Sequence, residues 1–162
     1  MKSESIKKAI EFAKNAHSGQ VRKYTGEPYV SHPIAVSKYL KLWHGESTDE
    51  MICAAILHDT VEDTDVTNFD IFTAFGSEVA TLVKWLTDIS CPEDGNRAAR
   101  KLKDRLHTRD APFEAQLIKC ADLIHNSKSI IRYDQSFAKV YLKEKRLTLD
   151  LMSDKTKGSA IF

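Results

Sequence analysis

Apolar side chains recur every three or four positions along most of the chain, which is the spacing of one face of an α-helix. In the first segment Ile6, Ile10 and Ala13 follow this spacing up to His17, and Gly19 then interrupts it. The same periodicity returns in later segments that are separated by Gly, Pro and Asn. Helices are therefore predicted over residues 3–17, 33–45, 47–63, 68–75, 79–88, 97–107, 110–131 and 137–152.

Local signals mark where several of these helices begin and end. Pro33 suits the first positions of a helix, and Gly45 ends the segment that follows it. Ser47 and Glu50 have the spacing of a capping box. The run after them, residues 51–57, is apolar throughout, which predicts a central helix that is buried on all sides.

No alternating apolar segment is flanked by the turn residues that bound strands, and no repeats occur. We therefore expect an all-α fold, a single-domain helical bundle over residues 1–153. Residues 154–162 are expected to form a frayed C-terminal tail. The side chains expected to face inward from the 110–131 helix are Leu117, Ala121, Ile124 and Ile131.

Composition excludes several classes of protein. The net charge of +1 provides no basic field for a nucleic acid, and no apolar run is long enough to span a membrane. The N-terminus lacks the apolar core of a secretory signal. The three cysteines are widely spaced without a CxxC pair, which favours reduced thiols and a cytoplasmic location. The oligomeric state is not readable from these features.

The charges are unevenly distributed along the chain. Residues 46–70 contain eight acidic residues and no Lys or Arg, whereas residues 97–109 contain six Lys or Arg and one Asp. Solvated helix faces would explain either run. The acidic run also contains the adjacent pair His58–Asp59, with Glu62 and Asp63 one helical turn further on. Ionisable groups beside a buried apolar helix are costly unless they are paired or bind a metal.

Two further residues have the chemistry of metal ligands. His32 precedes Pro33 and could otherwise be a surface or capping histidine, and Asp122 could otherwise form a buried ion pair with Lys119 or Arg132. Two imidazoles and two carboxylates suit a hard or borderline divalent ion such as Mn²⁺. Such an ion beside further carboxylates can bind phosphate oxygens and activate water, which points to hydrolysis of a phosphate compound.

Four segments carry a resemblance to a known family. They are AHSGQVRKYTGEPYVSHPIAV (16–36), AAILHDTVEDT (54–64), FGSEVATLVKWLTD (75–88) and LIKCADLIHN (117–126). In this order they resemble the HD-domain metal-dependent phosphohydrolases, and more narrowly the (p)ppGpp hydrolase domain of Rel/SpoT-type proteins and the stand-alone small alarmone hydrolases. The resemblance implies an HD-type helical bundle that degrades (p)ppGpp to GDP or GTP and pyrophosphate.

The resemblance also implies a role for each candidate residue. The ligands of one Mn²⁺, whose place Fe²⁺, Co²⁺ or Zn²⁺ could take, would be His32, His58, Asp59 and Asp122. Glu62 and Asp63 would orient and deprotonate the attacking water. The residues that hold the nucleotide would be Arg22, Lys23, Asn126 and Ser129.

The chain departs from the family pattern after Asn126, where Ser127 and Lys128 replace an apolar residue and an arginine. Lysine keeps the charge but lacks the planar fork of arginine, so the departure concerns substrate recognition. Three other functions remain open: a phosphohydrolase of another nucleotide, such as a 2′-phosphatase of NADPH, a non-catalytic nucleotide-binding HD module, and a generic helical interaction protein. The basic helix at 97–107 could contact phosphates or be a solvated face.

Overall fold

The apolar run 51–57 forms the central helix of the structure. In the computed structural model, which describes residues 3–162, helix α3 spans Asp49–Leu57, and all seven residues from Met51 to Leu57 are buried. The helices packed around α3 are α1 (Glu4–Ala16), α2 (Ser31–Trp43), α6 (Ser77–Leu86) and α8 (Phe113–Tyr133). Because helices cover α3 on several sides, a polar stripe along it would have no access to water.

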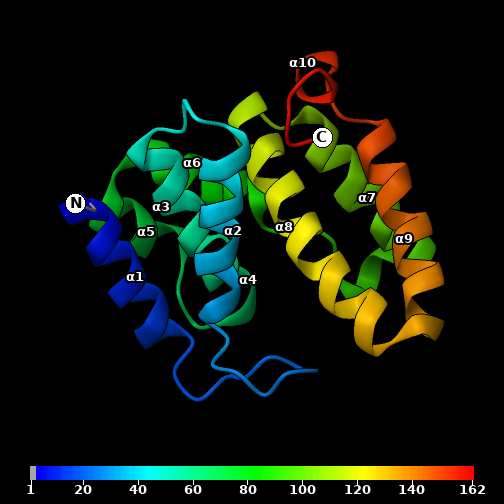
Figure 1. Cartoon of the computed structure of the whole chain (residues 1–162), viewed down its shortest axis with the longest axis horizontal. Helices are drawn as coiled ribbons and strands as arrows, with labels where there is room; N and C mark the ends of the chain where they lie inside the picture. The colour runs from blue at the N-terminus through cyan, green and yellow to red at the C-terminus, as the bar shows by residue number, and fades with distance from the viewer. Residues whose placement is uncertain (1–2) are drawn as a thin grey trace.

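The described part of the chain is helical without any β-strand, so the predicted all-α fold is confirmed (Figure 1). A single antiparallel bridge joins Val21 to Pro28 within the loop that leads into α2. The remaining helical elements are α4 (Thr60–Asp63), α5 (Asn68–Phe75), the 3₁₀ turn η1 (Pro92–Asp94), α7 (Arg97–Asp110), α9 (Gln135–Asp150) and α10 (Asp154–Lys157).

The C-terminal segment corrects one expectation, because it is packed against α8 rather than frayed. Thr156 in α10 is fully buried, and its hydroxyl donates a hydrogen bond to Gln116 Oε1 over 2.6 Å. Ile161 is only 4% exposed and belongs to the main core. The segment is held both by the hydrogen bond to Gln116 and by the burial of Ile161, and its short, mostly polar sequence reveals neither contact.

Three helix details also differ from the prediction. The cap of α3 is Thr48, whose hydroxyl accepts from the Met51 backbone N–H, while the Ser47 hydroxyl donates to the His44 carbonyl. Ile131 is 47% exposed, so it does not face inward. The helix predicted over 47–63 is interrupted at residues 58–59 and resumes as α4. This interruption places the His–Asp pair at a helix end.

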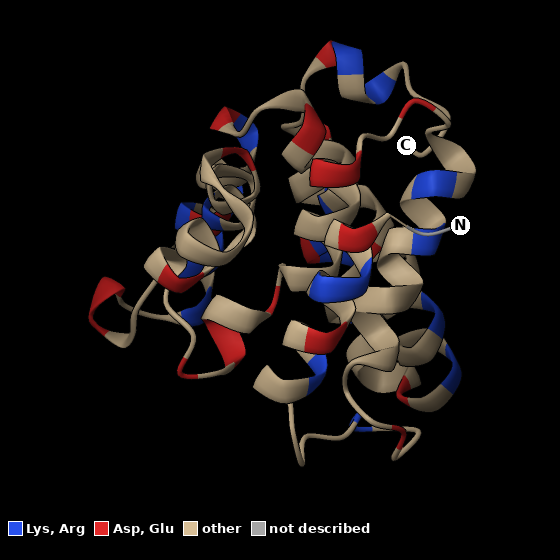
Figure 2. Ribbon diagram, turned by 90° about the vertical axis from the view of Figure 1, so that its left-hand side faces the viewer, with Lys and Arg blue, Asp and Glu red and all other residues tan. Residues whose placement is uncertain are grey.

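The basic run is largely neutralised by acids from other segments. Three of its six cations pair with acids from other segments: Arg97 with Glu144 at 2.8 Å, Lys101 with Asp88 at 2.8 Å, and Lys103 with Asp94 at 2.7 Å. A fourth, Arg109, pairs with its neighbour Asp110 at 2.7 Å. In the view of Figure 2, acidic and basic positions are interspersed over the fold. None of the helices within residues 3–162 combines the length and apolarity needed to cross a bilayer.

Candidate metal centre

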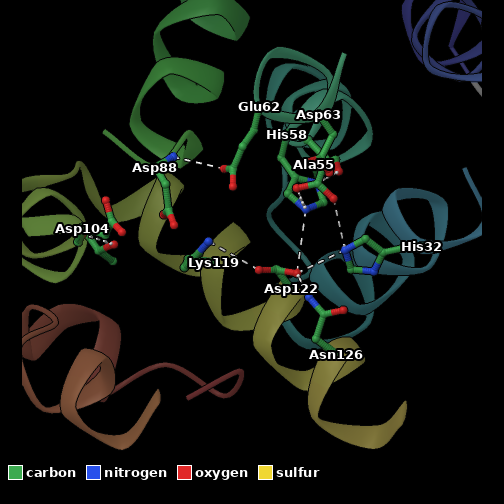
Figure 3. A network of polar contacts seen from close by, with 12 residues as sticks. His32, Ala55, His58, Glu62, Asp63, Asp88, Asp104, Lys119, Asp122 and Asn126 are labelled. Atoms are coloured by element: carbon green, nitrogen blue, oxygen red, sulfur yellow. Dashed lines mark hydrogen bonds and ion pairs between the residues drawn. The ribbon is translucent and has the colours of Figure 1, made fainter. Parts of the chain in front are cut away.

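Three separate helical regions bring the four predicted ligands together. His32 lies in the first turn of α2, His58 and Asp59 lie between α3 and α4, and Asp122 lies in the middle of α8. Helix α2 packs against both α3 and α8, so His32, His58 and Asp122 point toward one another (Figure 3). Asp59 joins them through its contacts with both imidazoles. Both imidazoles are buried, at 1% and 2% exposure.

The ligand atoms converge closely. His32 Nε2 lies 3.4 Å from Asp59 Oδ2 and 3.2 Å from Asp122 Oδ1. His58 Nε2 lies 3.0 Å from Asp59 Oδ1 and 3.8 Å from Asp122 Oδ1. Ligand atoms of His32, His58 and Asp59 are all within 4.8 Å of one another, and Asp122 reaches the group through its contacts with both imidazoles.

The hydrogen bonding of His58 tests whether these residues fit a metal ion. His58 Nδ1 lies 2.9 Å from the Ala55 carbonyl, which can only accept, so Nδ1 donates and Nε2 of the neutral ring carries a lone pair. Nε2 is buried and has no hydrogen bond among the described residues, although two carboxylates are near it. A lone pair beside two carboxylates is unfavourable without a cation between them. The donor set therefore fits a divalent ion.

The negative charges of Asp59 and Asp122 beside His58 also require a positive charge nearby. Burial works to lower the pKa of His58, but the charge of Asp59 and the contacts with Asp122 outweigh it and raise that pKa to about 10. For Asp122, burial is likewise outweighed, and the positive charge of Lys119 holds its pKa well below the usual range. The two carboxylates thus stay ionised. A proton or a metal ion must balance them, and a metal ion can bind both at once.

A histidine that the sequence reasoning missed positions His32. His125 Nδ1 lies 2.8 Å from His32 Nδ1, so one ring donates to the other. For His32 Nε2 to present a lone pair to a metal, His32 Nδ1 must be the donor and His125 the acceptor. Burial, together with the positive charge of Arg22, lowers the pKa of His125 to about 4, which keeps it a neutral acceptor. Its only sequence signal is its place beside Asn126.

Tyr29 is a second residue that sequence reasoning missed. Its hydroxyl lies 2.8 Å from Asp59 Oδ2 and 3.0 Å from Asp63 Oδ2, and it donates to these carboxylates. Burial and the negative charge of Asp59 raise the pKa of Tyr29, so the hydroxyl keeps its proton. Asp59 and Asp63 therefore do face the same side, as their helical spacing predicted, and Tyr29 links them.

Whereas Asp63 contacts Tyr29, the side chain of Glu62 is directed toward the residues that follow α6. Its Oε2 accepts from the Asp88 backbone N–H over 3.1 Å. Burial and the negative charge of Asp88 raise the pKa of Glu62. The Lys119 ammonium group lies 3.5 Å from Asp122 Oδ2, so the ion pair considered for Asp122 exists beside the metal centre (Figure 3). Asp122 therefore faces the two imidazoles with Oδ1 and the Lys119 ammonium group with Oδ2.

The predicted nucleotide-binding residues are only partly brought together. Arg22 donates to Asn126 Oδ1 over 2.9 Å, and Asn126 Nδ2 donates to Asp122 Oδ1 over 2.6 Å. This chain of hydrogen bonds connects the loop before α2 with the metal centre. Lys23 lies outside it, exposed above the Tyr24 ring, and the Ser129 hydroxyl donates to the backbone carbonyl of Asn126.

Lys128, which stands where the family has arginine, is also directed elsewhere. Its ammonium group donates to the Tyr39 hydroxyl over 2.7 Å, on the side of α8 that packs against α2. In this arrangement Lys128 stabilises the contact between two helices. Arg22 is therefore the guanidinium group that reaches the metal centre, through Asn126.

Comparisons with known proteins agree with this geometry. The family described as "HD domain" matches residues 9–145. A guanosine-3′,5′-bis(diphosphate) 3′-pyrophosphohydrolase of Aquifex aeolicus is 40% identical over 142 residues, which cover 88% of this chain and 20% of that protein. The corresponding enzyme MESH1 of Danio rerio is 38% identical over 125 residues, which cover 76% of this chain and 67% of that protein.

A solved structure shares the fold. The structure of a metazoan orthologue of SpoT that hydrolyses ppGpp matches with a TM-score of 0.84 at 28% identity, covering 94% of this chain and 87% of that one. The chain spans only about a fifth of the Aquifex protein, and about two thirds of the zebrafish one. The chain belongs to the HD domain family and, within it, to the ppGpp pyrophosphohydrolase group that contains SpoT and MESH1.

Proposed function

We propose that this protein hydrolyses guanosine-3′,5′-bis(diphosphate) to GDP and pyrophosphate, and the pentaphosphate form to GTP and pyrophosphate. The observation that carries the proposal is the convergence of two imidazoles and two carboxylates on one space, with the buried Nε2 of His58 left without a hydrogen bond. Relatives whose names state this activity share 38–40% identity with the chain, which supports the choice of substrate.

The residues that would hold the metal ion are His32, His58, Asp59 and Asp122. Mn²⁺ suits this mixture of nitrogen and oxygen ligands. When bound, such an ion supplies positive charge for phosphate oxygens and lowers the pKa of water. His125 and Tyr29 would keep His32 and Asp59 in the orientation that binding requires.

Glu62 and Asp63 would act on the attacking water. A carboxylate whose pKa is raised accepts a proton more readily, and the raised pKa of Glu62 suits it to this role. Asp63, held by Tyr29, would orient the same water. The water oxygen attacks the phosphorus next to the ribose, the bond from that phosphorus to the 3′ oxygen breaks, and the 3′ oxygen gains a proton.

Arg22, Lys23, Asn126 and Ser129 would bind the nucleotide. Arg22 is best placed, because it already lies within hydrogen-bond distance of Asn126 at the edge of the centre. Its guanidinium group can bind two phosphate oxygens at once. Binding the substrate would require Arg22 to exchange its bond with Asn126 for bonds with phosphate.

Product analysis tests the proposal. We would incubate chelator-stripped protein with ppGpp or with NADPH, with and without Mn²⁺, and separate the products by ion-exchange chromatography. The expected result is GDP and pyrophosphate from ppGpp in the presence of Mn²⁺ only. Asp59→Asn should abolish this, whereas Asp65→Asn, an exposed aspartate in the same segment, should not. Phosphate from NADPH alone would overturn the choice of substrate, and turnover of neither nucleotide would overturn the proposed activity.

A further inference from the structure

A groove of about 430 Å³ lies between α8 and α9, next to the C-terminal segment (compare Figure 1). Its walls are mostly aliphatic, with Leu123 and Ile124 from α8, Leu142 and Leu149 from α9, and Ile161 beside Phe162 from the C-terminal segment. Small-molecule sites in proteins have volumes of roughly 300–1,000 Å³ and mostly apolar walls. Nothing in the proposed hydrolysis uses this groove.

The groove is separate from the metal centre, although both are built on α8. Residues three or four apart share a face of a helix. Lys119, Asp122 and Asn126 face the metal centre. The groove is lined by the neighbouring stripe of Cys120, Ile124 and Ser127, and Leu123 lies at the border between the two stripes. A molecule in the groove would therefore contact α8 on another face from the one that holds Asp122.

The polar part of the groove lining is positively charged. It contains Lys145 and Arg146 and no acidic residue. Arg146 pairs with Asp150, which lies outside the lining, and both side chains are well exposed. Among residues 3–162, Lys145 has no carboxylate partner, and its ammonium group lies 5.2 Å from the centre of the Tyr141 ring. Asp122 and Asp88 act on Lys145 electrostatically but form no ion pair with it, so an anionic group beside Lys145 would gain a direct charged contact.

The apolar walls and the positive charge of the groove together indicate which class of small molecule it binds. The lining has one aromatic ring, that of Phe162, and one hydroxyl, that of Ser127, so a sugar or a nucleobase would lose most of its hydrogen bonds to water without replacement. An alkyl chain loses nothing by leaving water and gains by burial. We propose that the groove binds a medium-chain aliphatic carboxylate, with its chain along the aliphatic walls and its carboxylate beside Lys145 and Arg146.

Calorimetric titration of the full chain with decanoate, below its micelle concentration, tests this proposal. We expect binding of decanoate, and binding of the uncharged 1-decanol that is weaker by about tenfold, since the charge-assisted contacts are lost. Leu142→Glu should weaken decanoate binding by about tenfold or more, because it places a carboxylate inside the groove. Leu147→Glu is the matched control, since Leu147 is also on α9 and similarly exposed (44% against 42%) but does not line the groove. It should bind decanoate like the parent protein.

Other outcomes would overturn the proposal. These are no binding of decanoate to the parent, equal binding of decanoate and decanol, or equal losses in the two glutamate variants. If a second copy of the chain covers the groove, the parent would elute as a dimer and Leu142→Glu as a monomer, without decanoate binding. The titration uses neither a nucleotide nor a metal ion, so its result is independent of the proposed hydrolase activity.

Discussion

Replacing His125 tests whether an indirect contact controls the metal centre. In the parent protein His32 Nδ1 lies 2.8 Å from His125 Nδ1, inside a site where His32 is only 1% exposed, and it donates to His125 in the tautomer that metal binding requires. His125→Phe keeps a ring but removes the acceptor, so a buried N–H loses its partner. Such a loss costs about 1–3 kcal/mol of folding stability. The free energy of unfolding should fall by this amount in urea titrations.

The effect on metal binding follows from the same contact. Without its acceptor, the His32 ring is free to rotate or to move its proton to Nε2, and either change removes the lone pair that faces Asp59 and Asp122. Loss of such a supporting hydrogen bond typically weakens metal binding by about 10–100-fold. This corresponds to about 1.4–2.7 kcal/mol of binding free energy.

The matched variant is His125→Asn, because Asn Oδ1 occupies nearly the same position as His Nδ1 and also accepts a hydrogen bond. Calorimetric titration of Mn²⁺ into chelator-stripped proteins should show near-parental affinity for His125→Asn and weak binding for His125→Phe. Parental Mn²⁺ affinity in His125→Phe would refute the reasoning. So would equal weakening in both variants, since shape rather than the acceptor would then explain the loss.

Three further predictions concern the proposed base, the phosphate contact and the core. Glu62→Gln should retain Mn²⁺ binding and lower kcat by about 10²-fold or more, because the amide cannot take a proton from water; near-full kcat would contradict the assignment. Arg22→Ala should raise the apparent KM for ppGpp by about tenfold, as expected for a charged hydrogen bond, and an unchanged KM in steady-state assays would exclude Arg22 from binding. Leu57→Ala should lower the unfolding free energy by about 2–5 kcal/mol. Its control is Leu42→Ala, at a site that is 72% exposed, which should change the unfolding free energy by less than about 0.5 kcal/mol. Equal effects of the two variants in urea titrations would contradict the packing argument.

The local pattern of apolar and polar residues was sufficient to predict the helices and the central position of α3. The run from Met51 to Leu57 has no polar side chain, and such a run is stable only when every face is covered. The residue types of His58, Asp59 and Asp122 also indicated a metal ion or a charged partner, because ionisable groups beside apolar helices need one. These conclusions depend on neighbours in sequence, which the chain specifies directly, whereas the full set of four ligands with His32 was implied by the family resemblance.

Tertiary structure decided the contacts between residues that are far apart in sequence. The His32–His125 bond, the Tyr29 bridge to Asp59 and the groove between α8 and α9 each depend on how helices pack. The tail illustrates the same point, since Gln116 reaches Thr156 across 40 positions and makes a polar segment part of the fold. Helix packing angles arise from the summed fit of many side chains. No periodicity along one segment contains that information.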